Sequence, residues 1–218
     1  MMENLSPIVL FVYSRKNILK KTIAHLKKNR LAKKSRLYIF SDGYKSLEDK
    51  SNVDAVRIYL KKIRGFKKIK IIFRKKNFGL AKNIILGVTE VIKIHGKAII
   101  LEDDIFVSPH FLDFMNLSLK KFKNEKKIWH INGWNYEFKF PKNQRNTFYW
   151  KGMHCWGWAT WKDRWKNYKK NSLSIINNWS RNKIRNFNFD NSYNFWSQVL
   201  RNHNRSINTW AIFWYSSI

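Results

Sequence analysis

The sequence predicts an α/β fold: a mostly parallel, Rossmann-like sheet flanked by helices, followed by an aromatic-rich C-terminal part. In the first half of the 218 residues, short apolar runs alternate with amphipathic segments, as they do in βα units. Each apolar run also ends abruptly on polar residues, as buried strands do at the rim of a parallel sheet. A change in composition after about Asn132 marks the start of the aromatic-rich part.

Four apolar runs are the expected strands of this sheet. They span residues 8–13, 37–40, 70–73 and 98–101. The first is apolar at nearly every position, which is typical of a central strand covered on both faces. Ligands of open α/β sheets bind at the carboxyl ends of the strands. The polar residues that follow the four runs therefore define one candidate cleft.

Amphipathic segments between the runs predict helices. Apolar residues recur at helical spacing within residues 18–26, 53–60 and 80–91. A further helix is expected to begin at Ser108-Pro109, with Ser108 as the N-cap and Pro109 in the first helical position. That start leaves the acidic triplet Glu102-Asp103-Asp104 on the loop between a strand and a helix.

The C-terminal part does not follow the βα pattern. It is dense in Trp and Gly between residues 134 and 168. We expect a helix that starts after Trp158, another over about 189–202, and a final apolar strand over 207–215. Because the chain stops at Ile218 directly after this apolar run, we also expect that a C-terminal segment is missing.

Composition limits the classes of partner and the compartment. The net charge is +30, but the 44 Lys and Arg are spread along the chain, with 19, 14 and 11 in successive thirds. Lys outnumbers Arg by 32 to 12, whereas specific phosphate or base recognition favours Arg. We therefore expect no specific nucleic-acid partner, and peripheral contact with an anionic membrane instead. The single cysteine, Cys155, indicates a reducing compartment, so we expect a cytoplasmic protein, peripheral at the inner membrane face.

The triplet Glu102-Asp103-Asp104 is the most informative motif in this basic chain. It follows the apolar run 98–101, so a buried strand would deliver its carboxylates to the rim of the sheet. Hard divalent cations and their phosphate partners bind such oxygen-rich positions. The six histidines have no close metal-ligand spacing, so zinc is not expected. The triplet predicts a site for Mn²⁺ or Mg²⁺.

Taken in chain order, the strand-end residues resemble those of the GT-A superfamily of nucleotide-sugar glycosyltransferases. The residues that carry the resemblance are Arg15, Asp42, Arg74 with 77–80, the acidic triplet, and the segments 129–134 and 155–161. The likeness covers about the first 165 residues. Within the superfamily, the chain resembles bacterial family-2-like sugar transferases and the enzymes that add N-acetylglucosamine to mannose, whose metal motif is also Glu-Asp-Asp.

This resemblance implies roles for individual residues. Arg15 and Asp42 would lie near the nucleotide, with Asp42 close to the base, and Asn77, Gly79 and Leu80 would shape the loop beside the ribose and diphosphate. Asp104 would bind the metal ion, while Glu102 and Asp103 would meet the ribose or the sugar. Trp156, Gly157 and Trp158 would wall the sugar and acceptor side. Residues 1–134 would form the nucleotide-sugar-binding half and 135–218 the acceptor side, within one structural domain.

The catalytic base is harder to assign. An inverting transfer needs a carboxylate that takes the proton from the acceptor hydroxyl. In the relatives this base precedes a tryptophan on a late helix, and the matching stretch 193–196 has no acid at that position. Asp190 is the nearest acid and becomes the candidate base, with Glu137 next.

The sequence thus predicts a metal-dependent glycosyltransferase of hexosyl or N-acetylhexosaminyl type. It would move a sugar from a nucleotide-sugar donor to a glycan or lipid-linked acceptor, in surface polysaccharide synthesis. Three alternatives stay open: a sugar-phosphate nucleotidyltransferase, a basic nucleic-acid-binding module, and an inactive or truncated transferase that retains donor binding. The first would favour a Gly-rich loop after the first strand, and residues 14–17 contain no glycine.

Overall fold

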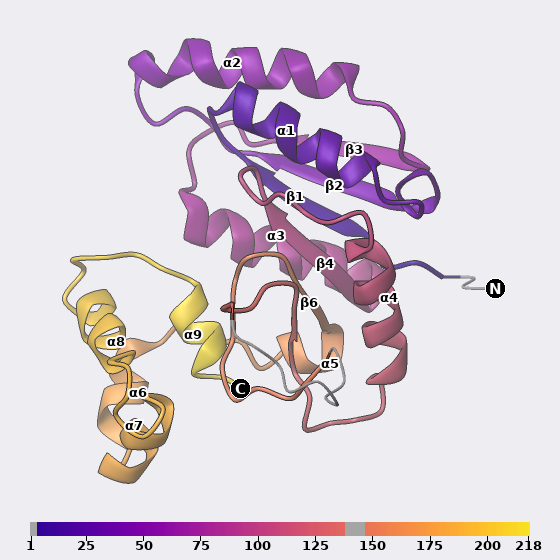
Figure 1. Ribbon diagram of the computed structural model, residues 1–218. Coiled ribbons are helices and arrows are strands. Elements are labelled where there is room, and N and C mark those ends of the chain that lie inside the picture. The colour runs from indigo at the N-terminus through magenta and orange to yellow at the C-terminus, as the bar shows by residue number, and fades with distance from the viewer. Residues whose placement is uncertain (1–3, 138–146) are drawn as a thin grey trace.

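A mixed six-stranded sheet forms the centre of the molecule (Figure 1). The computed structural model describes residues 4–137 and 147–218. The sheet has the strand order β3-β2-β1-β4-β6-β5, in which β1 to β4 are parallel and β6 pairs antiparallel with both β4 and β5. The strands are β1 (Ile8–Val12), β2 (Arg36–Ser41), β3 (Lys68–Phe73), β4 (Lys97–Glu102), β5 (Ile131–Asn132) and β6 (Trp158–Trp161). The predicted mostly parallel α/β sheet is confirmed.

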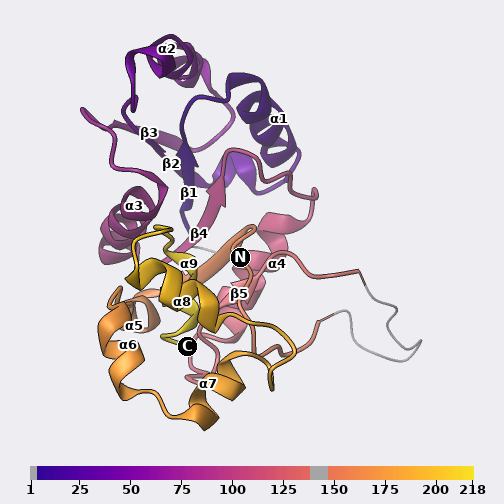
Figure 2. The same cartoon turned by 90° about the vertical axis from the view of Figure 1, so that its left-hand side faces the viewer.

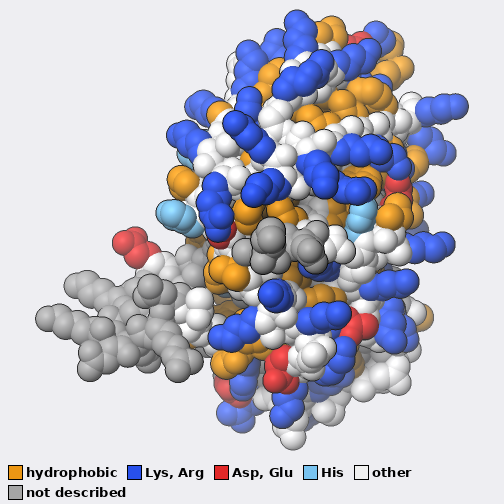
Figure 3. All heavy atoms as spheres, turned by 90° about the vertical axis from the view of Figure 1, so that its right-hand side faces the viewer, with side chains coloured by type: hydrophobic (Ala, Val, Ile, Leu, Met, Phe, Trp, Pro, Cys, Tyr) orange, Lys and Arg blue, Asp and Glu red, His pale blue; other side chains and the backbone are white. Residues whose placement is uncertain are grey.

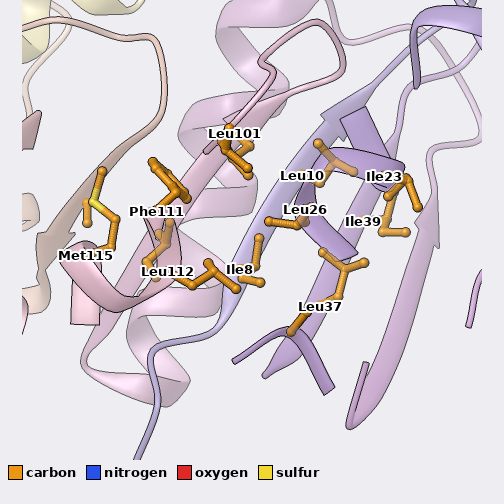
Figure 4. Close-up of a cluster of buried hydrophobic side chains, with 14 of the residues drawn as sticks. Ile8, Leu10, Ile23, Leu26, Leu37, Ile39, Leu101, Phe111, Leu112 and Met115 are labelled. Carbon is orange, nitrogen blue, oxygen red and sulfur yellow. The ribbon is translucent and has the colours of Figure 1, made fainter. Parts of the chain in front are cut away.

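Helices cover both faces of this sheet. The longer ones are α1 (Lys16–Lys27), α2 (Leu47–Lys62), α3 (Leu80–His95) and α4 (Phe111–Lys121), with a short 3₁₀ helix η1 (Ala32–Lys34) before β2. One hydrophobic cluster joins α1, α2 and α4 to one face of the sheet, and Figure 4 shows part of it, including Leu26, Ile8 and Leu112. A second cluster packs α3 against the other face. Because β1 is buried on both faces, all five of its residues are apolar.

The last quarter of the chain forms a helical lobe. It contains α5 (Lys162–Trp165), α6 (Ser172–Asn178), α7 (Arg181–Phe187), α8 (Trp196–His203) and α9 (Ala211–Tyr215). Figures 1 and 2 show α6, α7 and α8 grouped at the end of the molecule opposite α2. Their apolar side chains form a separate small cluster around Phe187, Val199 and Phe213. Among the described residues, no helix has the length and apolar character needed to cross a membrane.

Three predicted elements differ from the structure. The run 207–215 is not a strand; it contains α9. Trp210, directly before this helix, and Trp214 within it pack on the sheet, while Phe213 faces the helical lobe. This spacing buries both sides of a helix, so the continuous apolar run did not distinguish helix from strand. The expected helix over 189–202 begins only at Trp196, because Phe189, Asp190 and Asn191 have positive φ.

The third difference is the start of α4. The helix begins at Phe111 rather than at Pro109, and the Ser108 hydroxyl oxygen accepts a bond from His110 N in the preceding turn (3.3 Å). The capping oxygen comes instead from Asn29, whose Oδ1 accepts from Leu112 N (2.8 Å). A side chain 83 positions away in sequence thus satisfies an N-terminal amide of α4.

Candidate functional site

The acidic triplet lies at the carboxyl end of β4, beside the end of β1. Glu102 is the last residue of β4 and stands opposite Phe11 in the parallel register. Because β1 and β4 are neighbours, Arg15 at the start of α1 reaches the triplet. Its Nη2 pairs with the Asp103 carboxylate and lies 3.0 Å from Asp104 Oδ2. Thr22 of α1 adds a hydrogen bond to the Asp103 carbonyl oxygen (2.6 Å). The first βα unit therefore fixes the conformation of the triplet.

The three acids have different environments. Asp103 is buried, and burial raises the pKa of its carboxyl while the Arg15 guanidinium opposes that rise. Burial also raises the pKa of Glu102 to about 7, with Asp104 and Asp103 adding repulsion. The side chain of Asp104 is 42% exposed. Asp104 is thus the most exposed carboxylate of the triplet and the one most open to an incoming group.

Two cavities meet at Asp104. The larger has a volume of about 570 Å³ and the smaller about 280 Å³. Asp104, Ile105 and Trp156 line both. The larger is otherwise lined by Phe106, Val107, Ser108, Phe111, Gly133 and Trp134. The smaller is otherwise lined by Leu80, Ala81, Glu102, Cys155 and the segment 208–211. One half-exposed carboxylate therefore stands between an aromatic cavity and a smaller, more mixed one.

Asp42 joins the loops after β2 and β3 through hydrogen bonds, an arrangement that we call the Asp42 clasp. Its Oδ1 accepts from Gly43 N (3.0 Å) and Phe78 N (2.9 Å), and its Oδ2 accepts from Gly79 N (2.9 Å). Asn77 closes the clasp by donating from Nδ2 to the Gly43 carbonyl (2.7 Å). Asp42 is buried, so most of its hydrogen-bonding capacity holds the protein's own backbone.

This clasp sets the entry into α3. Gly79 precedes the helix with φ +72°, a left-handed conformation that glycine adopts without steric cost. The next residue, Leu80, is 54% exposed and forms part of the smaller cavity. Asp42, Asn77 and Gly79 thus support the cavity wall, while Leu80 reaches its surface.

The Trp156-Gly157-Trp158 segment divides between surface and core. Trp156 is 45% exposed and lines both cavities. Gly157 has φ +73°, and its carbonyl accepts from Gly133 N (2.8 Å). Trp158 is 1% exposed in β6, where its ring stacks on Trp210. The structure therefore corrects the expectation for Trp158: its ring is part of the hydrophobic core and walls neither cavity.

Residues 2–187 match the GNT-I family. The chain belongs to the GNT-I family. This family membership agrees with the resemblance to N-acetylglucosaminyltransferase-like enzymes that the sequence predicted. No curated protein matches the sequence.

Solved structures with a similar fold are distant from this GNT-I family chain. Residues 1–349 of S. aureus TarS are 12% identical with a TM-score of 0.39, over 54% of this chain and 33% of that one. A structure of S. aureus TarS with UDP aligns over 61% of this chain and 38% of its own, at 12% identity and a TM-score of 0.39. The mannosyltransferase PcManGT from Pyrobaculum calidifontis, solved with GDP-Man and Mn²⁺, is 10% identical with a TM-score of 0.47, over 74% and 46%. The chain spans less than half the length of each.

The candidate metal ligands of this GNT-I family chain suit an ion that is also coordinated by phosphate and water oxygens. In the part of the chain that the structure describes, no group of three or more His, Cys, Asp or Glu side chains could hold a metal. The half-exposed Asp104 carboxylate offers the hard oxygen that Mn²⁺ or Mg²⁺ prefers. Phosphate and water oxygens would have to complete the coordination, as they commonly do for Mg²⁺ in nucleotide sites.

Asp190 is not brought to these cavities. It lies in the turn after α7, outside the lining residues of both, and its side chain is 63% exposed with Arg185 Nε at 3.5 Å. The geometry gives no support to Asp190 as a base, and that role stays a prediction.

Sequence reasoning missed several residues of the smaller cavity wall, among them Asn208, Thr209 and Cys155. Asn208 and Thr209 come from the α8–α9 loop, where Asn202 of α8 brackets Thr209 with two hydrogen bonds (2.9 and 3.0 Å). No motif marks this loop. Cys155, used above only to infer the compartment, also lines the cavity, and burial raises its pKa to about 11. A neutral thiol is a poor nucleophile, so Cys155 forms wall rather than catalyst.

Proposed function

We propose that this chain is a metal-dependent glycosyltransferase that moves a sugar from a nucleotide-sugar donor to a glycan or lipid-linked acceptor in surface polysaccharide synthesis. The observation that carries the proposal is the position of Asp104, a half-exposed carboxylate between two cavities at the carboxyl ends of β1 and β4. During transfer, the sugar must lie between the nucleoside diphosphate of its donor and the acceptor. Two adjoining cavities with one shared acidic residue fit that requirement.

The smaller cavity is our proposed donor side. Asp104 would hold a Mn²⁺ or Mg²⁺ ion that supplies charge neutralisation for the nucleoside diphosphate leaving group. Glu102, Asn208 and Thr209 offer oxygens and an amide to the hydroxyls of the ribose or the donor sugar. Arg15, whose side chain is 47% exposed, holds Asp103 and Asp104 in place and adds positive charge near the diphosphate position.

The larger cavity is our proposed acceptor side. The indole rings of Trp134 and Trp156 lie 4.5 Å apart at 86°, so they form a corner with two flat apolar faces. Pyranose rings have apolar faces that pack on such indoles, while their hydroxyl edges need polar partners. Ser108 and Asp104 line the same cavity and supply those partners. This assignment does not follow the expected division of the chain: residues 1–134 line almost all of the larger cavity, with Trp156 added from 135–218, whereas both halves line the smaller one.

A second candidate function is donor binding without sugar transfer. It is favoured by the exposed position of Asp190, since an inverting transfer needs a carboxylate within reach of the acceptor hydroxyl. Measuring release of nucleoside diphosphate from a bound nucleotide sugar separates the two functions. Release that depends on added acceptor supports transfer, and tight donor binding with no release at any acceptor concentration supports the second candidate.

Calorimetric titration tests the donor site. UDP, GDP and CDP would each be titrated into the protein with and without Mn²⁺, at moderate salt, and the series repeated on Asp104→Ala. The matched control is Asp54→Ala, which removes a surface carboxylate paired with Lys50 on α2. We expect one nucleotide to bind only with Mn²⁺, in the wild type and the control but not in Asp104→Ala. Equal, salt-sensitive binding of all three nucleotides by every variant would contradict the site.

A further inference from the structure

The helix-to-strand connections of the sheet meet at one edge of the molecule. β1 to β4 are parallel, and β5 runs in the same direction because both β4 and β5 are antiparallel to β6. The segments that lead into β2, β3, β4 and β5 therefore all lie at the amino ends of these strands. We call this surface the basic edge and define it as residues 27–36, 61–68, 93–97 and 120–127.

Contacts within the basic edge bring neighbouring segments together. Lys67 N donates to the Ser35 carbonyl (2.9 Å), which joins the first segment to the second. Lys97 of the third segment lies near Lys123 of the fourth: burial, and then the Lys123 ammonium, lower the pKa of Lys97. The third segment also contacts β2, because His95 Nε2 lies 2.8 Å from the hydroxyl of Tyr38.

Charge is concentrated on this edge. The four segments contain 18 Lys and Arg and one acid, Glu125. The strand-to-helix segments at the opposite edge, residues 13–16, 42–47, 74–80 and 103–110, contain six Lys and Arg and three acids. Figure 3 looks at this side of the molecule and shows many Lys and Arg side chains and few acidic ones among the hydrophobic and other groups. The even spread of charge along the sequence therefore does not describe the surface, because folding gathers four distant segments.

The chemistry of the basic edge indicates the kind of partner. Fifteen of its 18 cations are Lys, which act as mobile point charges and suit a fluid array of anionic groups rather than fixed phosphates. Binding of single-stranded nucleic acid uses exposed aromatic rings as stacking platforms. Within these four segments, all of which the structure describes, the aromatic side chains are Phe66 and Phe122, and both are partly buried. Both cavities described above lie at the opposite edge.

We propose that the basic edge docks this protein on an anionic phospholipid bilayer. The proposal does not depend on the transferase activity. It does set the orientation of the candidate site: β4 has six residues from Lys97 to Glu102, so the site would stand roughly 17 Å farther from the lipid than Lys97, at about 3.3 Å per residue. An acceptor anchored in the same membrane would then have to extend at least that far.

Vesicle co-sedimentation tests the proposal. The protein would be mixed with phosphatidylcholine vesicles containing about 30% phosphatidylglycerol or none, at about 0.1 M and 0.5 M salt. The test variant is Lys33→Glu/Lys67→Glu/Lys121→Glu, with one exposed Lys from each of three segments. The control, Lys20→Glu/Lys169→Glu/Arg181→Glu, makes the same change in net charge at exposed positions away from the edge. Circular dichroism would verify that both variants fold.

We expect binding only to the anionic vesicles, weaker at high salt, and reduced at least on the order of a hundredfold in the test variant but little in the control. Equal losses in the two variants would overturn the proposal, because they would show that net charge rather than the basic edge attracts the lipid. No binding to anionic vesicles at low salt would also overturn it. So would tighter binding to a single-stranded oligonucleotide than to the vesicles at the same salt, lost in the test variant, which would make the edge a nucleic-acid surface.

Discussion

Acid lability caused by His130 is a prediction that follows directly from the geometry. The His130 ring stacks on Trp158 with centroids 5.2 Å apart. Its Nδ1 accepts from the Trp214 indole N–H (3.0 Å), which requires Nε2 to carry the proton and to donate to the His154 carbonyl (3.0 Å). In this neutral tautomer, the His130 side chain links the start of β5 to α9 and to the loop before Trp156. Protonating Nδ1 would break the bond from Trp214.

The size of the effect follows from the pKa values. Burial lowers the pKa of His130 to about 3 in the folded protein, against 6.5 in an unperturbed chain. The unfolded chain therefore takes up a proton below pH 6.5 that the folded protein does not accept until about pH 3. The stabilising difference is complete above pH 6.5 and is lost as the pH falls. Between pH 7 and pH 5 the loss from this group is at most about 2 kcal/mol.

Urea unfolding at pH 7 and pH 5 measures this loss, with His130→Gln as the matched variant. A Gln side chain can donate to the His154 carbonyl and accept from Trp214, but it does not titrate. We expect the free energy of unfolding to fall between the two pH values by about 2 kcal/mol more in the wild type than in the variant. An equal fall in both proteins would refute the assignment of a buried neutral imidazole.

Three further predictions concern the site and its support. Gly133→Ala places a Cβ 2.4 Å from the Gly157 carbonyl oxygen, so we expect a loss of about 1–3 kcal/mol in urea unfolding; unchanged stability would contradict the close approach. Asp42→Asn loses the charge and one acceptor oxygen of the clasp, and should cost about 2 kcal/mol and raise KM for the donor, whereas a change in neither would contradict the clasp. Trp156→Ala should raise KM for the acceptor with little change in stability, while Trp158→Ala should cost about 3–5 kcal/mol. The reverse pattern would contradict the division between surface and core.

The four parallel strands could be predicted from the sequence because each is a short apolar run, and β1, β2 and β4 are almost entirely buried. Residues 8–13, 37–40, 70–73 and 98–101 all fall within or overlap β1 to β4, and the structure extends the second, third and fourth by one or two residues at their ends. Continuous apolar runs bounded by polar residues leave few alternatives to a covered parallel strand. The polar residues at the strand ends followed from the same pattern, which is why Arg15 and the acidic triplet were identified as site candidates.

The C-terminal part could not be predicted in the same way. Its apolar residues pack on two clusters at once, so residues 207–215 show no single periodic face, and aromatic density alone does not distinguish wall from core. Trp156 and Trp158 are only two positions apart, yet Trp156 lines the cavities and Trp158 lies in the core, with Gly157 at positive φ between them. No sequence signal pointed to Asn208 and Thr209, whose place in the cavity wall depends on how the α8–α9 loop folds back.

By itself, the sequence determined the parallel sheet, the acidic triplet at a strand end and the resemblance to glycosyltransferases, because these depend on local patterns of burial and charge. Tertiary structure decided that Arg15 pairs with Asp103 and Asp104, that Asp104 is the exposed acid between two cavities, and that Asp42 clasps two loops. It also gathered the basic edge from four segments. Each of these depends on strand order and loop paths, which bring together residues that no local pattern relates.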